Sequence, residues 1–354
     1  MILHIFLYDK FDSDYIKRIN TLYDQKGHLF FIYGKKIENN IPSIENCNNV
    51  VFSTEFPNLV SWMHYLIKEI KTTDRVIIHS LMSRFVLLAL FVCLRSCKSK
   101  YFWMIWGADL YNAYWNRNKS LIWRLRELIR KRVIKGIPAV GYIQADYEFL
   151  KKHYETGAKF YKVSYTYDFN DYPKLPKDKS VTNILLANSA SKDCRYEEMI
   201  EKISSFKDIP SVRVYCVLSY PKDTPYINEV VKLGRECLGD SFIPLIDYMT
   251  YNEYTKFLSD IDIAIFNHDR QQALGNIASL AYYGKVIYIN KQNGCKGYFE
   301  DMGVKLFDTD SFCEDALCIR LTPEEINHNK RSIEFFYSDE QFKKRWDAVF
   351  YSEW

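Results

Sequence analysis

The chain has 354 residues, which is enough for two ordinary domains that each bury a core. Its formal net charge of +4 is too small to indicate a nucleic-acid-binding protein. The nine cysteines include no C-x-x-C pair, which argues against a zinc site or a disulfide framework and favours a reducing cytosol. The longest apolar run, residues 85–94, is too short to span a bilayer.

The first half alternates short apolar runs with helical patterns. Strands are predicted at 2–8, 29–33, 50–53, 75–79, 102–106 and 139–143, and helices near 15–25, 59–71, 82–97, 121–135 and 146–153. Short β-branched runs between amphipathic helices are typical of a parallel sheet buried on both faces. Residues 1–168 are therefore predicted to form a Rossmann-like domain.

The alternation restarts after residues 169–181, where two prolines and mixed charge predict a linker. Strands are predicted at 183–187, 212–218, 242–245, 261–266 and 286–289, with helices at 196–206, 226–238, 251–259 and 273–283. This indicates a second domain at 182–322. Two helices are predicted at 323–354, separated near Ser338, and they are expected to pack back on the first domain. The predicted fold class is α/β, with two doubly wound domains facing each other across a cleft.

Ligands of doubly wound sheets bind at the carboxyl ends of the strands. No two glycines are spaced G-x-G, which argues against a nicotinamide-dependent oxidoreductase and a P-loop hydrolase. The loop after 261–266 instead carries Arg270 and two amide side chains before a helix, which together would suit a diphosphate-binding site. Asn188 and Ser189 follow another strand and could donate further hydrogen bonds. Each loop alone could be an ordinary surface loop or helix cap, but two in one domain favour phosphate recognition.

In the first half, the run W-G-A-D-L-Y at 106–111 places Asp109 and Tyr111 after a strand. A carboxylate at the rim of a cleft could accept a proton from a substrate hydroxyl, and flanking aromatic rings could stack on a sugar. The alternative is a helix-capping aspartate beside core tryptophans.

Residues 117–135 hold eight Lys or Arg side chains against the single acid Glu127. Apolar residues recur at helical spacing in this segment, and tryptophans lie nearby. A basic amphipathic helix of this kind predicts contact with an anionic membrane, the alternative being a solvated basic face over a core stripe. The residues expected at this surface are Trp115, Trp123, Arg124, Arg130 and Lys131.

Together the motifs resemble the bacterial TDP-N-acetylfucosamine:lipid II N-acetylfucosaminyltransferases, glycosyltransferase family 56. The resemblance rests on W-G-A-D-L-Y, on N-S at 188–189, on R-Q-Q at 270–272 and on Y-P at 220–221. Two departures are Ala187 and Ala273, where glycine is expected. The resemblance implies a GT-B fold, a TDP-sugar donor in the second domain and a polyprenyl-diphosphate-linked acceptor. It also implies peripheral attachment to the cytoplasmic face of the inner membrane, in enterobacterial common antigen or O-antigen assembly.

The expected reaction moves a 4-acetamido-4,6-dideoxyhexose-type sugar without a metal or another cofactor, because no D-x-D-type carboxylate pair is placed for one. Arg270 would neutralise the departing diphosphate, and Asp109 would act as general base or contact the acceptor. A non-catalytic sugar-nucleotide or polysaccharide-binding protein with the same fold is the alternative function. The remaining donor contacts are expected from Asn188, Ser189, Tyr220, Tyr248, Gln271, Gln272, Gly275 and Asn276, and acceptor contacts from Trp106 and Tyr111.

Overall fold

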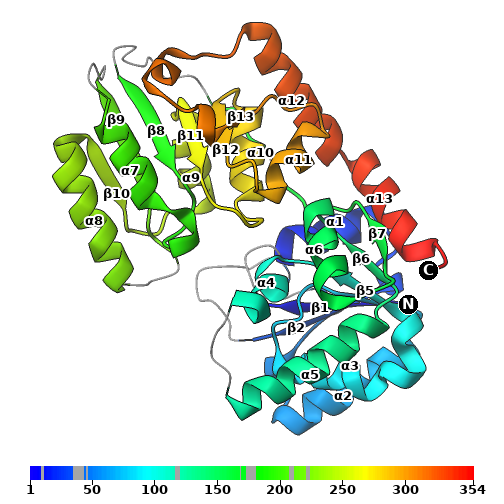
Figure 1. The fold of residues 1–354 in the computed structure, drawn as a ribbon. Coiled ribbons are helices and arrows are strands. Elements are labelled where there is room, and N and C mark those ends of the chain that lie inside the picture. Colours follow the sequence, from blue (N-terminus) through cyan, green and yellow to red (C-terminus); the bar gives the residue numbers. More distant parts are fainter. Residues whose placement is uncertain are drawn as a thin grey trace. The chain divides into compact units, whose positions relative to one another are not determined.

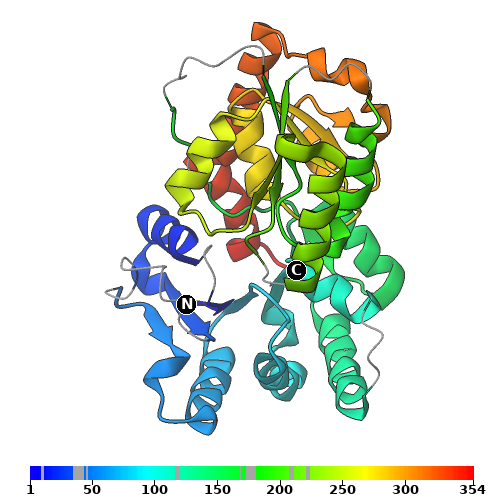
Figure 2. The ribbon, with the colours of Figure 1, turned by 90° about the vertical axis from the view of Figure 1, so that its left-hand side faces the viewer.

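The computed structural model describes residues 1–8, 12–34, 44, 47–115, 120–167, 169–172, 181–206, 211–220 and 224–354. The chain divides into two compact units, residues 1–167 with 337–354, and residues 168–336. Each unit is built on one parallel sheet with helices packed against it (Figures 1 and 2).

The first unit contains a seven-stranded parallel sheet in the order β3-β2-β1-β4-β5-β6-β7. Its strands are β1 (Ile2–Leu7), β2 (His28–Tyr33), β3 (Val50–Phe52), β4 (Arg75–Ile78), β5 (Tyr101–Met104), β6 (Ala139–Gly141) and β7 (Lys159–Tyr161). Its helices are α1 (Asp12–Leu22), α2 (Leu59–Thr72), α3 (Arg84–Cys97), α4 (Ala108–Trp115), α5 (Leu121–Gly136), α6 (Gln144–Tyr154) and α13 (Asp339–Tyr351).

Small polar residues start several helices because their side chains accept the unpaired N–H groups of the first turn. Ser83 accepts from Val86 N in α3, and Ser120 accepts from Trp123 N in α5. Ser338 begins α13 in the same way, so the break predicted there is confirmed.

Side chains on β1 alternate between the two faces of the sheet. Leu3 and Ile5 join the core cluster to which α2, α3 and α5 contribute. His4 lies on the other face, where its ring meets Phe350 of α13 edge-on at 5.8 Å. Trp346 of α13 is fully buried on that face and donates to Ser164 O at 3.1 Å.

A row of hydrogen-bonded rings runs through this second face. His4 Nε2 lies 3.0 Å from His28 Nδ1, and His4 Nδ1 lies 3.3 Å from His79 Nε2. His79 Nδ1 lies 2.7 Å from the Tyr165 hydroxyl, which the Trp106 indole contacts at 2.5 Å. Because an indole N–H can only donate, the Tyr165 hydroxyl accepts from Trp106 Nε1.

The second unit contains a six-stranded parallel sheet in the order β10-β9-β8-β11-β12-β13. Its strands are β8 (Thr182–Leu186), β9 (Val212–Val217), β10 (Phe242–Leu245), β11 (Ile263–Phe266), β12 (Val286–Ile289) and β13 (Phe307–Asp308). Its helices are α7 (Tyr196–Ser204), α8 (Thr224–Leu238), α9 (Tyr251–Ser259), α10 (Leu274–Tyr282), α11 (Gly294–Glu300) and α12 (Pro323–Tyr337).

The C-terminal segment, expected to return to the first domain from residue 323 onward, is divided between the units. Almost all of α12 belongs to the second unit, where Lys330 pairs with Asp171 at 2.8 Å and Asn329 accepts from Lys305 N at 2.9 Å. The return to the first unit begins only at residue 337. Four short elements were not predicted because their brief patterns resemble loops: the edge strands β7 and β13 and the helices α4 and α11.

Strand order identifies the crevice in the second sheet. From β8 the chain proceeds through β9 and β10 on one side, and β11 then pairs with β8 on its other side. The order therefore reverses between β8 and β11, and the loops at their carboxyl ends flank a topological switch point, the usual ligand position in such sheets.

Candidate functional site

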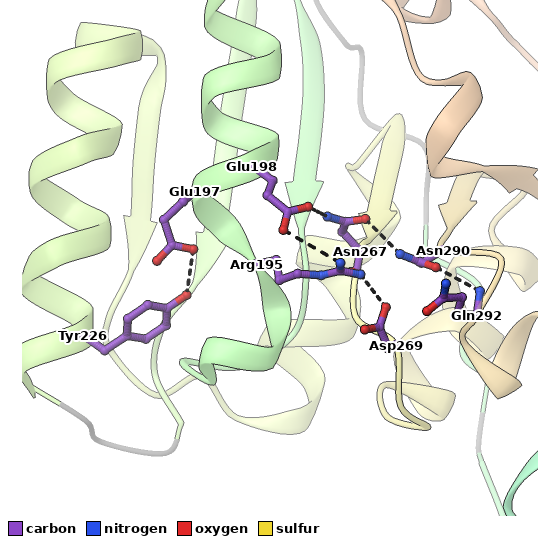
Figure 3. Close-up of polar contacts among 8 residues, drawn as sticks. All are labelled: Arg195, Glu197, Glu198, Tyr226, Asn267, Asp269, Asn290 and Gln292. Atoms are coloured by element: carbon purple, nitrogen blue, oxygen red, sulfur yellow. Dashed lines mark hydrogen bonds and ion pairs between the residues drawn. The ribbon is translucent and has the colours of Figure 1, made fainter. Parts of the chain in front are cut away.

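Two reciprocal ion pairs join the loops that follow β8 and β11. Arg270 Nε donates to Asp193 Oδ2 at 2.7 Å. In the opposite direction, Arg195 Nη2 donates to Asp269 Oδ1 at 2.5 Å (Figure 3). Each loop thus supplies one cation and one anion, so the two loops are held together as a single structure at the switch point.

Arg195 also fixes the start of the second loop (Figure 3). Its Nε and Nη2 donate to the Asn267 carbonyl at 2.9 and 2.5 Å. The Asn267 amide in turn donates to Glu198 Oε2 at 2.9 Å and accepts from Asn290 Nδ2 at 3.4 Å. Because Asn290 follows β12, this network connects the carboxyl ends of three neighbouring strands.

Arg270, the predicted diphosphate contact, is oriented by Asp193. Its side chain is 18% exposed. Only Nε is bonded, and across the described ranges neither terminal nitrogen has a hydrogen-bond partner. The forked end of a guanidinium matches the geometry of a phosphate or diphosphate, so this arrangement leaves the binding edge available.

Three other predicted residues gather around the buried thiol of Cys194. Its Sγ lies 3.5 Å from Ser189 Oγ, 4.0 Å from Asn188 Oδ1 and 3.9 Å from Gln272 Nε2. Burial raises the pKa of the Cys194 thiol, which therefore remains neutral and packs between the loops. The structure thus brings the N-S and R-Q-Q motifs together, because β8 and β11 are neighbouring strands.

Two buried polar atoms of the second loop lack a hydrogen-bond partner within the described part of the chain. They are Nδ1 of His268 and Oε1 of Gln271. Burial lowers the pKa of His268 to about 3, so its ring is neutral. Its Nε2 faces the Gln272 carbonyl at 3.4 Å, which makes Nδ1 the acceptor. Both atoms are therefore hydrogen-bond acceptors, and both belong to residues within two positions of Arg270 in the chain.

The backbone shows why glycine is expected at both departures from the family pattern. Ala187 has φ 52° and Ala273 has φ 65°, within the left-handed region that glycine adopts most readily. Ala273 immediately precedes α10, and Gly275 and Asn276 lie in that helix's first turn. Asn276 Nδ2 donates to Tyr254 OH at 2.9 Å, which ties α10 to α9.

The two predicted tyrosines lie after β9 and β10 and are exposed. Ala190 N donates to the Tyr220 carbonyl at 2.7 Å, which joins the loops after β8 and β9. Neither of the two loops at the switch point has a hydrogen bond to Tyr248 in the described residues. Its place at the end of β10 follows the strand-end rule but puts it two strands from β8.

The structure corrects the position expected for Asp109. The side chain is 4% exposed, not at a rim, and its carboxylate accepts from Leu81 N at 3.0 Å, Trp103 Nε1 at 2.8 Å and Trp106 N at 3.0 Å. Burial raises the pKa of Asp109, against the effect of these three donors. Such a carboxylate positions the loops after β4 and β5, and we replace the general-base interpretation with this positioning role.

Two expected surface residues are also interior. Tyr111 is buried and donates to Asp146 Oδ1 at 2.8 Å. Arg130 is buried too, with bonds to Glu127 at 2.8 Å and to the Asp109 carbonyl at 2.6 Å. Helical spacing alone could not show that these residues face the interior, because their burial depends on α4 and α6 packing beside α5.

The remaining first-half residues keep some exposure. Arg124 and Lys131 are exposed on α5, and Trp123 and Trp106 are half-buried. The side chain of Trp115 lies outside the described part of the chain. In the described ranges, no helix is both long and apolar enough to cross a membrane, and no three His, Cys, Asp or Glu side chains gather as metal ligands.

Sequence reasoning missed Asp193, Arg195 and Asp269 as supports of the site. A signal was present in the chain: D-C-R at 193–195 and D-R at 269–270 place opposite charges in both strand-end loops. Only the adjacency of β8 and β11 shows that these charges pair with each other.

Comparison with solved structures identifies the fold. The chain is similar to WaaG, a glycosyltransferase involved in lipopolysaccharide biosynthesis, with a TM-score of 0.61 and 13% identity over 99% of this chain and 100% of that one. It is also similar to WaaB, a lipopolysaccharide outer core galactosyltransferase, with a TM-score of 0.63 and 10% identity over 100% of both chains. A third similar structure is trehalose-6-phosphate from E. coli bound with UDP-2-fluoro glucose, with a TM-score of 0.60 and 10% identity over 98% of this chain and 97% of that one.

These likenesses show the GT-B fold expected from the sequence. A family model described as 4-alpha-L-fucosyltransferase, glycosyl transferase group 56, matches residues 41–353, nearly the whole chain. The chain therefore belongs to glycosyltransferase group 56 and is a glycosyltransferase with a GT-B fold.

Proposed function

We propose that this glycosyltransferase takes a deoxy-amino sugar of the 4-acetamido-4,6-dideoxyhexose type from a TDP-sugar. The acceptor is a polyprenyl-diphosphate-linked saccharide at the cytoplasmic face of the inner membrane, in enterobacterial common antigen or O-antigen assembly. Family membership and the resemblance of the four motifs support this reaction.

The observation that carries the proposal is the guanidinium of Arg270 at the switch point between β8 and β11. Asp193 holds Nε, and the forked end remains for a diphosphate. Departure of TDP requires stabilisation of its growing negative charge, and a preorganised cation supplies this without moving during the reaction. We therefore propose metal-independent transfer in which Arg270 and the first turn of α10 stabilise the leaving group.

The donor contacts follow from the same loops. Asn188, Ser189 and Gln272 surround Cys194, so they would meet the diphosphate and sugar as one group. Gln271 and Asn276 would contact sugar hydroxyls or the acylamino group. The aromatic rings of Tyr220 and Tyr248 would contact the nucleotide base of the donor.

The test is transfer by the purified protein. It would be incubated with TDP- and UDP-sugars and lipid-linked acceptors, with and without EDTA, and products read by mass spectrometry. Arg270→Ala should lose roughly 3 kcal/mol of transition-state stabilisation, while Arg235→Ala, at an exposed position of α8, should keep wild-type activity. Full activity in Arg270→Ala, or loss of wild-type transfer with EDTA, would refute the mechanism. Donor binding without transfer or hydrolysis would instead support a non-catalytic sugar-nucleotide-binding protein.

A further inference from the structure

Helix α5 directs apolar side chains outward. Leu121, Ile122, Leu125 and Leu128 are between 59% and 82% exposed. Residues 121, 125 and 128 follow the i, i+4, i+7 spacing of one helix side. Val133 and the partly buried Ile129 take the inner side and pack in the core of the first unit. The apolar residues of α5 therefore form two stripes and not one. The outward stripe does not pack against other parts of the chain that the structure describes.

The neighbouring helices extend this apolar surface. Leu88, Phe91 and Val92 are exposed on α3, and Val60 is exposed on α2. Helix α3 packs between α2 and α5, and the three helices lie together on one side of the first sheet (Figures 1 and 2). Exposed apolar side chains gathered on packed helices mark an interaction surface. We call it the α2–α3–α5 face.

All exposed charged side chains of these three helices are basic. Their two acids are withdrawn: Glu69 is buried, and Glu127 is half-buried against Arg130 at 2.8 Å. One of the basic residues, Lys135, is paired with Glu155 of a neighbouring segment at 2.8 Å. The basic set is Lys68, Lys71, Arg84, Arg95, Arg124, Lys131, Arg132 and Lys135.

Half-buried Arg126 and buried Arg130 connect this face to the carboxyl-end loops of the first sheet. Arg126 Nη2 donates to the Met82 carbonyl at 2.6 Å, and Arg130 Nη1 donates to the Asp109 carbonyl at 2.6 Å. Asp109 itself holds Leu81 N at 3.0 Å. Helix α5 is thus fastened to the loops after β4 and β5, on the edge of the sheet where a ligand of this unit would bind.

We propose that the α2–α3–α5 face docks on an anionic lipid bilayer, with the outward apolar side chains of α5 and α3 inserted among the lipids. The inference rests on the membrane part of the proposed function and assigns it to defined residues. Apolar insertion combined with basic charges is the physical requirement for binding an anionic surface. The charge pattern selects lipid over a second copy, because a symmetric contact would place these basic side chains opposite one another.

Vesicle flotation of the full chain tests the proposal. The protein should float with vesicles containing phosphatidylglycerol, much less with pure phosphatidylcholine vesicles, and less at high salt. Replacing Leu121, Leu125 and Leu128 by Gln should lower binding at least about tenfold, since three inserted side chains are lost. The double variant Arg124→Gln, Lys131→Gln should measurably reduce the preference for the anionic lipid, because two of the eight basic side chains are lost.

Matched controls are Ile246→Gln and Phe335→Gln, which change exposed apolar residues of the second unit and should not alter flotation. Circular dichroism would verify that every variant is folded. Unchanged binding of the triple Gln variant, or no flotation of the wild type, would overturn the proposal. A wild-type dimer that the triple variant converts to monomer would assign the face to a second copy instead.

Transfer assays separate this inference from the proposed function. The triple variant should keep its kcat with a short-chain, water-soluble acceptor and lose transfer to an acceptor embedded in vesicles. Arg270→Ala should show the reverse pattern, with normal flotation and impaired transfer to both acceptors.

Discussion

Arg270 and Asp193 form a 2.7 Å ion pair in which the carboxylate holds only Nε of the guanidinium. The arginine expected to bind the donor is therefore fixed by the neighbouring strand-end loop before any ligand arrives. Preorganisation of this kind matters because a cation already in place need not reorganise as charge develops.

Exchanging the charges of this pair separates support from catalysis. Asp193→Arg combined with Arg270→Asp should restore the ion pair and the melting temperature. Transfer should remain depressed about a hundredfold or more, because the cation then lies on the wrong loop. The rate would be measured with saturating donor.

The control for this exchange is the exposed pair of Lys291 and Asp310, which meet at 2.6 Å. Swapping their charges should leave activity unchanged. Recovery of transfer in the Asp193→Arg, Arg270→Asp variant would show that the pair serves only to hold the loops together.

Ala273→Gly should stabilise the second unit. Its φ of 65° costs an alanine more than a glycine, and relief of this strain should exceed the added chain entropy by about 0.5–1 kcal/mol. Ala278→Gly, in the interior of α10, should instead destabilise by about 1 kcal/mol or more. Urea unfolding followed by circular dichroism would compare them, and equal effects of the two changes would contradict the strain argument.

Asp109→Asn should destabilise the first unit by about 1–3 kcal/mol, because an amide cannot accept all three N–H donors that the carboxylate accepts. Tryptophan fluorescence is a suitable measurement, since all seven tryptophans belong to this unit. A positioning role predicts that residual activity keeps the wild-type pH profile. Wild-type stability with loss of the acidic limb of that profile would restore the general-base interpretation.

Acid should destabilise the first unit through its row of histidines. Burial lowers the pKa of His4 and His79 well below the usual value, and that of His28 to about 4. As the pH falls below about 6.5 the unfolded chain binds protons that the folded chain does not, so the free energy of unfolding decreases. The full contribution is present above about pH 6.5 and is lost progressively toward the folded-state pKa values.

The measurement is urea unfolding by tryptophan fluorescence at a series of pH values from 7 to 5. His28→Gln should flatten the pH dependence because one titrating group is lost. A free energy of unfolding that does not vary over this range would show that the row is not buried as neutral rings.

The sequence alone determined the alternation of strands and helices and the motifs at the strand ends, because these are local patterns. Periodicity gave β8, β11 and the helices after them, and the strand-end rule singled out Asn188, Ser189 and Arg270. The expected donor contacts at the switch point in the second sheet were therefore predictable, whereas their supports Asp193, Arg195 and Asp269 were not.

Only the tertiary structure decided which partners those residues meet. The pairing of Asp193 with Arg270 depends on β8 lying beside β11, a contact between segments far apart in the chain. Asp109 and Arg130 are interior because α4, α5 and the loop after β4 close over them. Helical spacing likewise shows that α5 is amphipathic, but its apolar residues occupy two sides, and the neighbours α3 and α6 determine which side joins the core and which faces outward.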